Sequence, residues 1–80
     1  MGIREAVANR IVYFCYERNI SFHSLARSSA IPPTTLKNII SGVSANPGIV
    51  TIKKICDGLD ISIIEFFDTE AFRGLEQEIR

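Results

Sequence analysis

Two consecutive prolines near the middle of this 80-residue chain limit its fold more than any other feature. Proline excludes the residue before it from helical geometry, so a helix that approaches Ile31-Pro32-Pro33 must end there. Pro33 can itself occupy the first position of a new helix, where its missing N–H does no harm. The chain therefore predicts two short helices around a tight turn, over about residues 22–29 and 33–41.

The spacing of apolar residues predicts two longer helices on either side of this pair. Residues 3–18 carry one apolar stripe, and Asn19 follows it as a residue that tolerates the left-handed conformation of a helix end. A later helix is expected to have Asn46 as its N-cap and Pro47 as its first residue, and to end at Gly58. Its inward-facing residues are expected to be Ile49, Ile52, Ile55, Cys56 and Leu59.

Capping residues define the remaining helix ends. Ser21 is placed to cap the helix over 22–29, and Gly42 is placed to end the helix over 33–41. Ser62 and Glu65 have the spacing of a capping box, which predicts a fifth helix over about residues 63–68. The last dozen residues, 69–80, form either a short sixth helix or a frayed end.

Composition narrows the class of protein. A hydrophobic content of 46% over 80 residues indicates one folded domain. The longest apolar run, residues 11–16, is far shorter than the roughly 20 residues that span a bilayer. Arg4, Glu5 and Arg10 interrupt the N-terminus, which argues against a secretory signal. We therefore expect a cytoplasmic protein without a membrane partner.

The charges are divided unevenly along the chain, although the formal net charge is zero. Residues 1–56 hold seven basic and two acidic residues, a net charge of +5, whereas residues 57–80 hold two basic and seven acidic residues, a net charge of −5. A basic body suits a protein that turns one face towards phosphates. Ordinary surface charge explains the same pattern, so both interpretations stay open.

Reactive side chains are few. Cys15 and Cys56 lie far apart without metal-ligand spacing, and His23 is the only histidine. We interpret both cysteines as reduced thiols in the core. The chain also lacks a glycine-rich phosphate loop and a set of residues for nucleophilic or acid–base catalysis. The prediction is a non-enzymatic protein without a metal, a cofactor or a small-molecule ligand.

The two central helices have the features of a helix-turn-helix, in which one face of the second helix packs on the first and the other reads bases. Leu25 and Ala26 allow close approach of the two helices, and Ile31 fills the turn. The inner face of the second helix is predicted from its apolar residues, and its outer face from its polar ones. The inner residues are Leu36 and Ile39, and the outer ones are Thr34, Lys37, Asn38 and Ser41.

Residues 22–41, FHSLARSSAIPPTTLKNIIS, resemble the bipartite motif of the Cro and phage-repressor family, also called the XRE family. The resemblance covers roughly residues 7–68. It implies an all-α fold, a compact five-helix bundle of the lambda-repressor-like type, with a DNA-binding domain over 1–68. The tail over 69–80 is either a helix that packs on the body or on a second subunit in a dimer, or a frayed end. The matching segments outside the motif are Arg10-Ile11, Asn46-Pro47, Thr51-Ile52-Lys53-Lys54-Ile55, Leu59-Asp60-Ile61-Ser62 and Glu65-Phe66-Phe67.

The chain departs from the family pattern at several positions. Ala30 occupies the turn position that is usually glycine, and Phe22 stands where a glutamine often contacts a phosphate. Pro32 replaces a serine that commonly caps the second helix of the motif. Cys15 and Ile40 replace an arginine–glutamate pair, and we predict that these two side chains touch.

The resemblance also implies which residues contact DNA. Pro33, Thr34 and Asn38 are at the base-facing positions. Asn38 can pair with an adenine edge and the Thr34 methyl suits thymine, which suggests an A·T-containing half-site. The predicted phosphate contacts are Phe22 and His23 through backbone amides, together with Arg27, Thr35, Lys37, Ser41, Ser44 and Asn46.

These observations favour a sequence-specific transcriptional regulator, most simply a repressor that binds a palindromic operator on double-stranded DNA as a homodimer. The candidate dimer surface is the fifth helix and the tail, with Phe66, Phe72, Leu75 and Ile79. The alternative is a protein-interaction module or antitoxin that uses the same fold without reading DNA. Apolar Phe22 and Pro33 on the expected DNA face favour that alternative.

Overall fold

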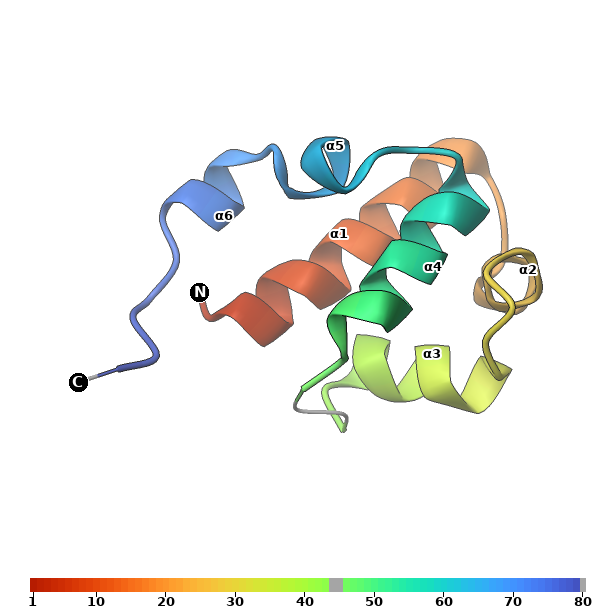
Figure 1. The fold of residues 1–80 in the computed structure, drawn as a ribbon, viewed down its shortest axis with the longest axis horizontal. Helices are drawn as coiled ribbons and strands as arrows, with labels where there is room; N and C mark the ends of the chain where they lie inside the picture. Colours follow the sequence, from red (N-terminus) through yellow and green to blue (C-terminus); the bar gives the residue numbers. More distant parts are fainter. Residues whose placement is uncertain (44–45, 80) are drawn as a thin grey trace.

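The computed structural model describes residues 1–43 and 46–79, which form six helices and no strand (Figure 1). In the bundle α2 packs against α4, while α3 packs against both α1 and α2. The expected all-α fold with five helices and a short sixth one is confirmed. The helices are α1 (Ile3–Arg18), α2 (Phe22–Ser28), α3 (Pro33–Ser41), α4 (Ile49–Leu59), α5 (Ile63–Phe67) and α6 (Glu70–Arg73).

Local capping chemistry sets most of these helix ends, as the sequence predicts. Asn19 ends α1 in the left-handed conformation with φ 55°, and Gly42 ends α3 with φ 84°. The Ser21 hydroxyl accepts a hydrogen bond from the Ser24 amide at 3.0 Å. The Ser62 hydroxyl accepts one from the Glu65 amide, also at 3.0 Å. Each bond satisfies an amide that has no partner within its own helix.

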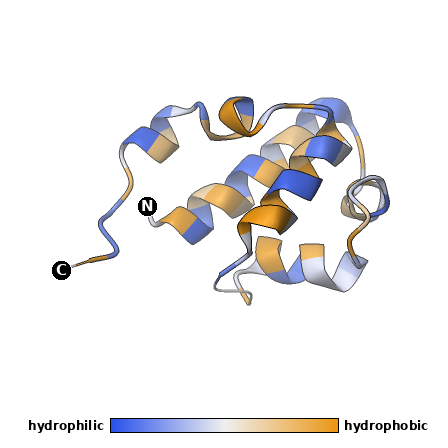
Figure 2. Ribbon diagram, in the orientation of Figure 1, coloured by the Kyte–Doolittle hydropathy of each residue, from blue (hydrophilic) through white to orange (hydrophobic). Residues whose placement is uncertain are grey.

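One hydrophobic core joins the first five helices, with apolar residues drawn from each of them (Figure 2). The predicted anchors of the helix-turn-helix, Leu25, Ala26, Ile31, Leu36 and Ile39, are all buried. Cys15 and Cys56 are free thiols within the core, and burial raises the pKa of both. Both thiols therefore stay protonated at neutral pH and pack as small apolar groups, which confirms their structural interpretation.

The expected start of the fourth helix is wrong by two residues. Gly48, in an extended conformation, is the N-cap, and its carbonyl accepts the first helical hydrogen bond from the Ile52 amide at 3.1 Å. Ile49 is 66% exposed and does not face the core. The reason is that the first turns of α1 and α4 leave an open hollow of about 310 Å³ between them, and Ile49 lies at its edge.

Gly58 does not end α4, contrary to the prediction. The helix continues to Leu59, and Asp60 takes the left-handed conformation with φ 57°. Gly58 instead allows α4 to approach the end of α2. A Cβ at this position would overlap the Ser29 hydroxyl and lie 3.0 Å from the Ser29 nitrogen and 3.1 Å from the Ser28 carbonyl carbon. A larger residue at position 58 therefore requires the Ser29 hydroxyl and the end of α2 to move.

The C-terminal segment is less helical than its apolar spacing suggests. It forms a single turn, α6, and the Phe72 ring packs at 6.2 Å from the Phe66 ring and at 4.8 Å from the Phe67 ring. Phe66 is fully buried in the chain's own core, so it is not free to form the dimer surface assigned to it. Phe72 packs against that core and is half-buried, and its part in a dimer stays a prediction. Ile79 is 86% exposed.

In the described residues no helix is both long enough and apolar enough to cross a membrane.

We predict that Gly58→Ala destabilises the protein. Alanine gains about 1 kcal/mol of helix propensity over glycine. Overpacking costs about 1–3 kcal/mol, so we expect a net loss of about 1 kcal/mol in the free energy of unfolding, measured by urea titration. Ser29→Ala provides the control, because the Ser29 hydroxyl has no hydrogen-bond partner among the described residues. That change should be close to neutral alone and should reduce the cost of Gly58→Ala; equal costs in both backgrounds would contradict the packing explanation.

Candidate nucleic-acid interface

The outer face of α3 is the surface that the sequence assigns to DNA. Its inner face is anchored by Leu36 and Ile39, which are 0% and 3% exposed. Pro33, Thr34, Lys37 and Ser41 are exposed and Asn38 is half-buried, so the predicted base-facing side chains are outside the core. Their contacts with DNA stay a prediction.

The turn before α3 sets the direction of that helix. Ala30 is left-handed with φ 56°, a conformation that is strained for a residue with a Cβ and that glycine adopts at no such cost. The Ile31 amide donates to the Ala26 carbonyl at 3.1 Å, and the Ile31 side chain is buried. Pro32 is the N-cap of α3 in an extended conformation and offers no side-chain hydrogen bond.

The structure brings together only some of the predicted phosphate-contacting residues. Phe22 and His23 on α2 and Lys37 and Ser41 on α3 border one apolar hollow of about 320 Å³, together with Pro33. Thr35 is half-buried on α3. Two residues lie elsewhere: Arg27 borders a separate hollow with Ser24 and Ser28, and Asn46 lies beside the start of α1. Ser44 is outside the described residues.

The electrostatics of this face favour an anionic partner. The chain has no aspartate or glutamate between Glu17 and Asp57, so α2 and α3 contribute no carboxylate. Arg27 and Lys37 are exposed on these two helices. Phosphates are therefore attracted by these cations without repulsion from carboxylates on the same helices.

A comparison with protein families shows that residues 2–71 match the sequence model of the Cro/C1-type HTH DNA-binding domain. The chain belongs to this family. This match confirms the resemblance of residues 22–41 to the Cro and phage-repressor family. It also confirms that the chain is a DNA-binding domain. Domains of this family are typically non-enzymatic. A search among curated proteins and a search among solved structures each found no match.

Two arginines of this Cro/C1-type domain support the fold instead of facing a ligand. Arg10 donates from Nε to the Phe66 carbonyl at 2.7 Å and from Nη2 to the Glu65 carbonyl at 2.8 Å, which caps the end of α5. Arg18 donates to the Leu59 carbonyl at the end of α4. Both guanidinium groups also contact the Phe14 ring, at 4.4 and 5.5 Å from its centroid. The +5 charge of residues 1–56 therefore overstates the charge available to DNA.

Another basic residue is also engaged. Lys53 forms an ion pair with Asp57 one turn later on α4, and both Lys53 and Lys54 are exposed. Within the described residues, no group of three or more His, Cys, Asp or Glu side chains could hold a metal ion.

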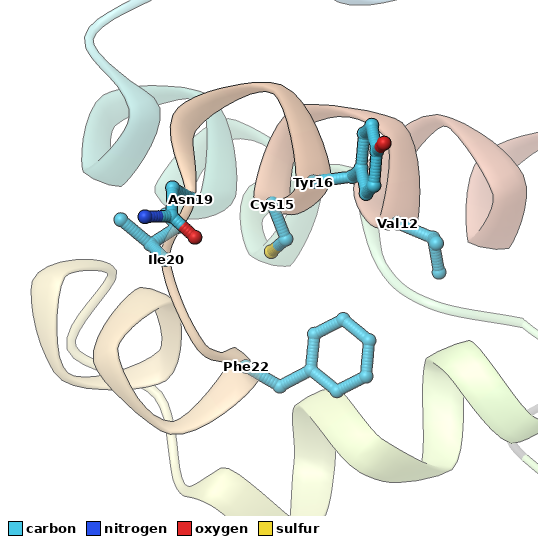
Figure 3. Close-up of a pocket in the computed structure, with 6 residues that line it drawn as sticks. All are labelled: Val12, Cys15, Tyr16, Asn19, Ile20 and Phe22. Carbon is cyan, nitrogen blue, oxygen red and sulfur yellow. The ribbon is translucent and has the colours of Figure 1, made fainter.

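A further hollow, for which the sequence analysis made no prediction, lies between α1 and the start of α2 (Figure 3). It has a volume of about 630 Å³, and the Phe22 ring points across it towards Val12, Cys15 and Tyr16. Val12 and Tyr16 are 39% and 87% exposed. The sequence does indicate that Val12 and Tyr16 are exposed, because both lie outside the apolar stripe that α1 buries.

Tyr13 and Cys15, also on α1, make contacts of different kinds. Tyr13, next to Val12, donates a hydrogen bond to Glu17, which raises the pKa of the Tyr13 hydroxyl. Cys15 on α1 belongs to the hydrophobic core, and Ile40 on α3 packs against that core. The helices α1 and α3 contact each other. The predicted contact between Cys15 and Ile40 stays a prediction.

We predict that Arg10→Met lowers stability without weakening DNA binding. Methionine keeps the apolar stem but loses both hydrogen bonds to the end of α5, for an expected loss of about 1–2 kcal/mol because the group is only partly buried. The free energy of unfolding and the salt dependence of DNA affinity are the measurements. Lys54→Met is the matched control and should leave stability unchanged. A smaller salt slope for Arg10→Met would place this arginine on the DNA instead.

Proposed function

We infer that this chain is a sequence-specific transcriptional regulator, acting as a repressor, that inserts α3 into the major groove of double-stranded DNA. The observation that carries this proposal is the outer face of α3, where Thr34 is exposed and Asn38 half-buried, and α2 and α3 contain no carboxylate. A helix presented in this way is what direct reading of base edges requires.

Base reading is assigned to three residues at the start and middle of α3. Asn38 can donate to and accept from the edge of adenine, an interaction worth about 1–3 kcal/mol of discrimination against other bases. The Thr34 methyl group packs against the thymine methyl group, and Pro33 makes apolar contact only. An operator half-site that contains A·T pairs follows from this set.

Phosphate contacts position the domain on the duplex. Lys37 and Arg27 provide charge, and the amides of Phe22 and His23 point from the start of α2. Thr35, Ser41, Ser44 and Asn46 complete the set that we assign. The domain that carries these contacts is placed at residues 1–68 and the tail at 69–80. About four to six phosphate contacts per subunit make the affinity fall steeply with salt.

A homodimer on a palindromic operator supplies specificity and repression together. Two copies of α3 held roughly 34 Å apart enter successive major grooves on one side of the duplex. A protein bound in this way blocks polymerase sterically and needs no further domain.

A protein-interaction module is the second candidate function, and the hollow between α1 and the start of α2 favours it. Val12, Tyr16 and Phe22 place exposed apolar and aromatic groups around that hollow, and aromatic residues are enriched where proteins bind one another. An antitoxin or adaptor of this fold would use that surface, and its binding would not depend on a particular DNA sequence.

Selection of bound DNA from a random-sequence library separates the two functions. We expect an enriched, palindromic, A·T-containing site at low salt. Enrichment of no sequence, with a folded protein and with weak binding to all duplexes alike, would leave the protein-interaction function in its place.

Asn38→Ala tests the base-reading assignment on the selected site. We expect affinity for the selected half-site to fall by about 1–3 kcal/mol, with relaxed preference at one base pair in a repeated selection. Affinity for unrelated duplexes should change little. Equal weakening on all sequences would show that Asn38 positions the backbone and does not read a base.

Lys37→Gln tests the phosphate assignment. Removal of one phosphate contact should reduce the slope of log affinity against log salt by about 0.9 per subunit, without change in the selected sequence. Lys53→Gln is the control, because Lys53 pairs with Asp57 on α4, and its slope should match that of the native protein. An unchanged slope for Lys37→Gln would remove that residue from the interface.

A further inference from the structure

The hollow of about 320 Å³ between the start of α2 and one side of α3 has an apolar wall, although it lies among residues that we assign to DNA. Phe22 and Pro33 are exposed on this wall, while Ile40 is half-buried and packs against the core. Exposed apolar groups gain free energy from an apolar partner, so this part of the face is suited to an apolar group of the DNA. The other residues at the border are polar or charged: His23, Lys37 and Ser41.

The apolar wall offers few hydrogen-bonding groups. Proline has no N–H, so neither Pro32 nor Pro33 provides an amide donor at the start of α3. The Phe22 side chain is a hydrocarbon ring without a donor or an acceptor. Phosphate oxygens and the polar groups of bases therefore find no partner on this wall, and they would lose hydration if they were placed against it.

The base edges in the major groove of DNA carry one kind of apolar group. That group is the C5 methyl of thymine, whereas the other groups on these edges are hydrogen-bond donors and acceptors. 5-Methylcytosine carries the same methyl group at the same atom. A pyrimidine C5 methyl is therefore the group whose chemistry matches the wall that Phe22 and Pro33 form.

The place of the hollow on α3 agrees with this occupant. Pro33 and Lys37 lie one turn apart on the same side of α3, and both border the hollow. Pro33 is assigned to a base and Lys37 to a phosphate, so the hollow adjoins both kinds of contact. On a pyrimidine, C5 lies at the end of the major-groove edge that is nearest to the backbone of its own strand. A methyl group at C5 is therefore placed between base and phosphate in the same way.

We propose that this hollow receives the C5 methyl group of one pyrimidine in each operator half-site, and that Phe22 is a specificity-determining residue of the domain. The proposal rests on the proposed function and extends it, since Phe22 is assigned there only a phosphate contact through its amide. Thymine is the occupant in unmodified DNA, and 5-methylcytosine brings the same group. The exposed Phe22 and Pro33, which taken alone favour a protein partner, then have a role in reading DNA.

Phe22 also borders the larger hollow beside α1, and that hollow provides a control (Figure 3). Val12 and Tyr16 border the larger hollow and not the one beside α3. Neither residue is assigned to DNA, and Tyr16 is 87% exposed. Removal of the Tyr16 ring should therefore leave the hollow beside α3 unchanged.

The first experiment removes methyl groups from the DNA. Deoxyuridine replaces each thymine of the selected palindrome in turn, in both half-sites, and base pairing is kept because the two bases differ only in the C5 methyl. At the thymine that enters the hollow, we expect the affinity of the native protein to fall about fourfold per half-site, the ratio that corresponds to burial of one methyl group. The two half-sites of the palindrome together should then lose about fifteenfold.

The second experiment identifies the side chain that contacts this methyl group. In Phe22→Ala the ratio of the affinities for the thymine and deoxyuridine duplexes should fall close to one, because the aromatic part of the wall is gone. Tyr16→Ala is the control and should keep the ratio of the native protein. Thr34→Ser removes only the Thr34 methyl group, so it should abolish the response of a different thymine and keep this one.

Phe22→Gln keeps the test decisive if the alanine variant folds poorly. Glutamine has a similar reach, and its amide can donate a hydrogen bond to a phosphate. We therefore expect this variant to retain affinity for the duplex while its ratio for thymine over deoxyuridine falls close to one. Thermal unfolding monitored by circular dichroism shows whether each variant is folded.

A third experiment distinguishes the two sources of the methyl group. Cytosine and 5-methylcytosine are compared at the same position, each opposite guanine. We expect 5-methylcytosine to bind more tightly than cytosine, by about the same factor of four. Direct competition between the thymine and 5-methylcytosine duplexes then identifies the natural occupant. Tighter binding of thymine assigns the hollow to unmodified operators, and tighter binding of 5-methylcytosine assigns it to methylated DNA.

Equal affinity for thymine and deoxyuridine at every position would overturn the proposed methyl site. A ratio that stays at its native value in both Phe22 variants would also overturn it, because another side chain would then contact the methyl group. Either result leaves the proposed function intact, since the native protein still selects a DNA sequence. Failure of the native protein to select any sequence removes the proposed function itself, so the two failures are distinguishable.

Discussion

The close contact between Ser29 at the end of α2 and Gly58 in α4 is the constraint on which the rest of the helix-turn-helix depends. It holds the end of α2 against the body of the protein with no room for a side chain between the two backbones. Ala30 must then turn immediately in a left-handed conformation, which directs Ile31 into the core and α3 out of it. The positions of Thr34 and Asn38 on the surface therefore depend on Gly58, a glycine in α4.

The basic residues of this domain have two different roles, which a count of charges in the sequence does not distinguish. Arg10 and Arg18 stack on Phe14 and cap the ends of α5 and α4, because the carbonyls at those ends have no partner within the helix. Arg27 and Lys37 stay exposed on helices without carboxylates. The first pair stabilises the bundle, and the second pair is the one that we propose for contacts with phosphates.

Local chemistry made much of the fold predictable, whereas packing did not follow from it. Ser21, Ser62, Asn19 and Gly42 act on their own neighbours, so their capping roles could be inferred correctly from the chain alone. The membership in the Cro/C1-type family was predictable for the same reason, since the motif over 22–41 is a continuous segment. The start of α4 was misplaced because Asn46-Pro47 and Gly48 are both competent starts, and only the observed hydrogen bond from Ile52 to Gly48 decides between them.

The sequence by itself determined that the chain is all-helical, where its first three helices begin, and which face of α3 is polar, because each of these depends on residues within a few positions of one another. Only the tertiary structure decided that Gly58 is a packing position, that Phe66 belongs to the chain's own core with Phe72 packed against it, and that Val43, Ile49 and Val50 remain uncovered. These outcomes depend on distances between elements that are remote in the sequence. An apolar residue at helical spacing is buried only where another part of the chain comes close enough to cover it.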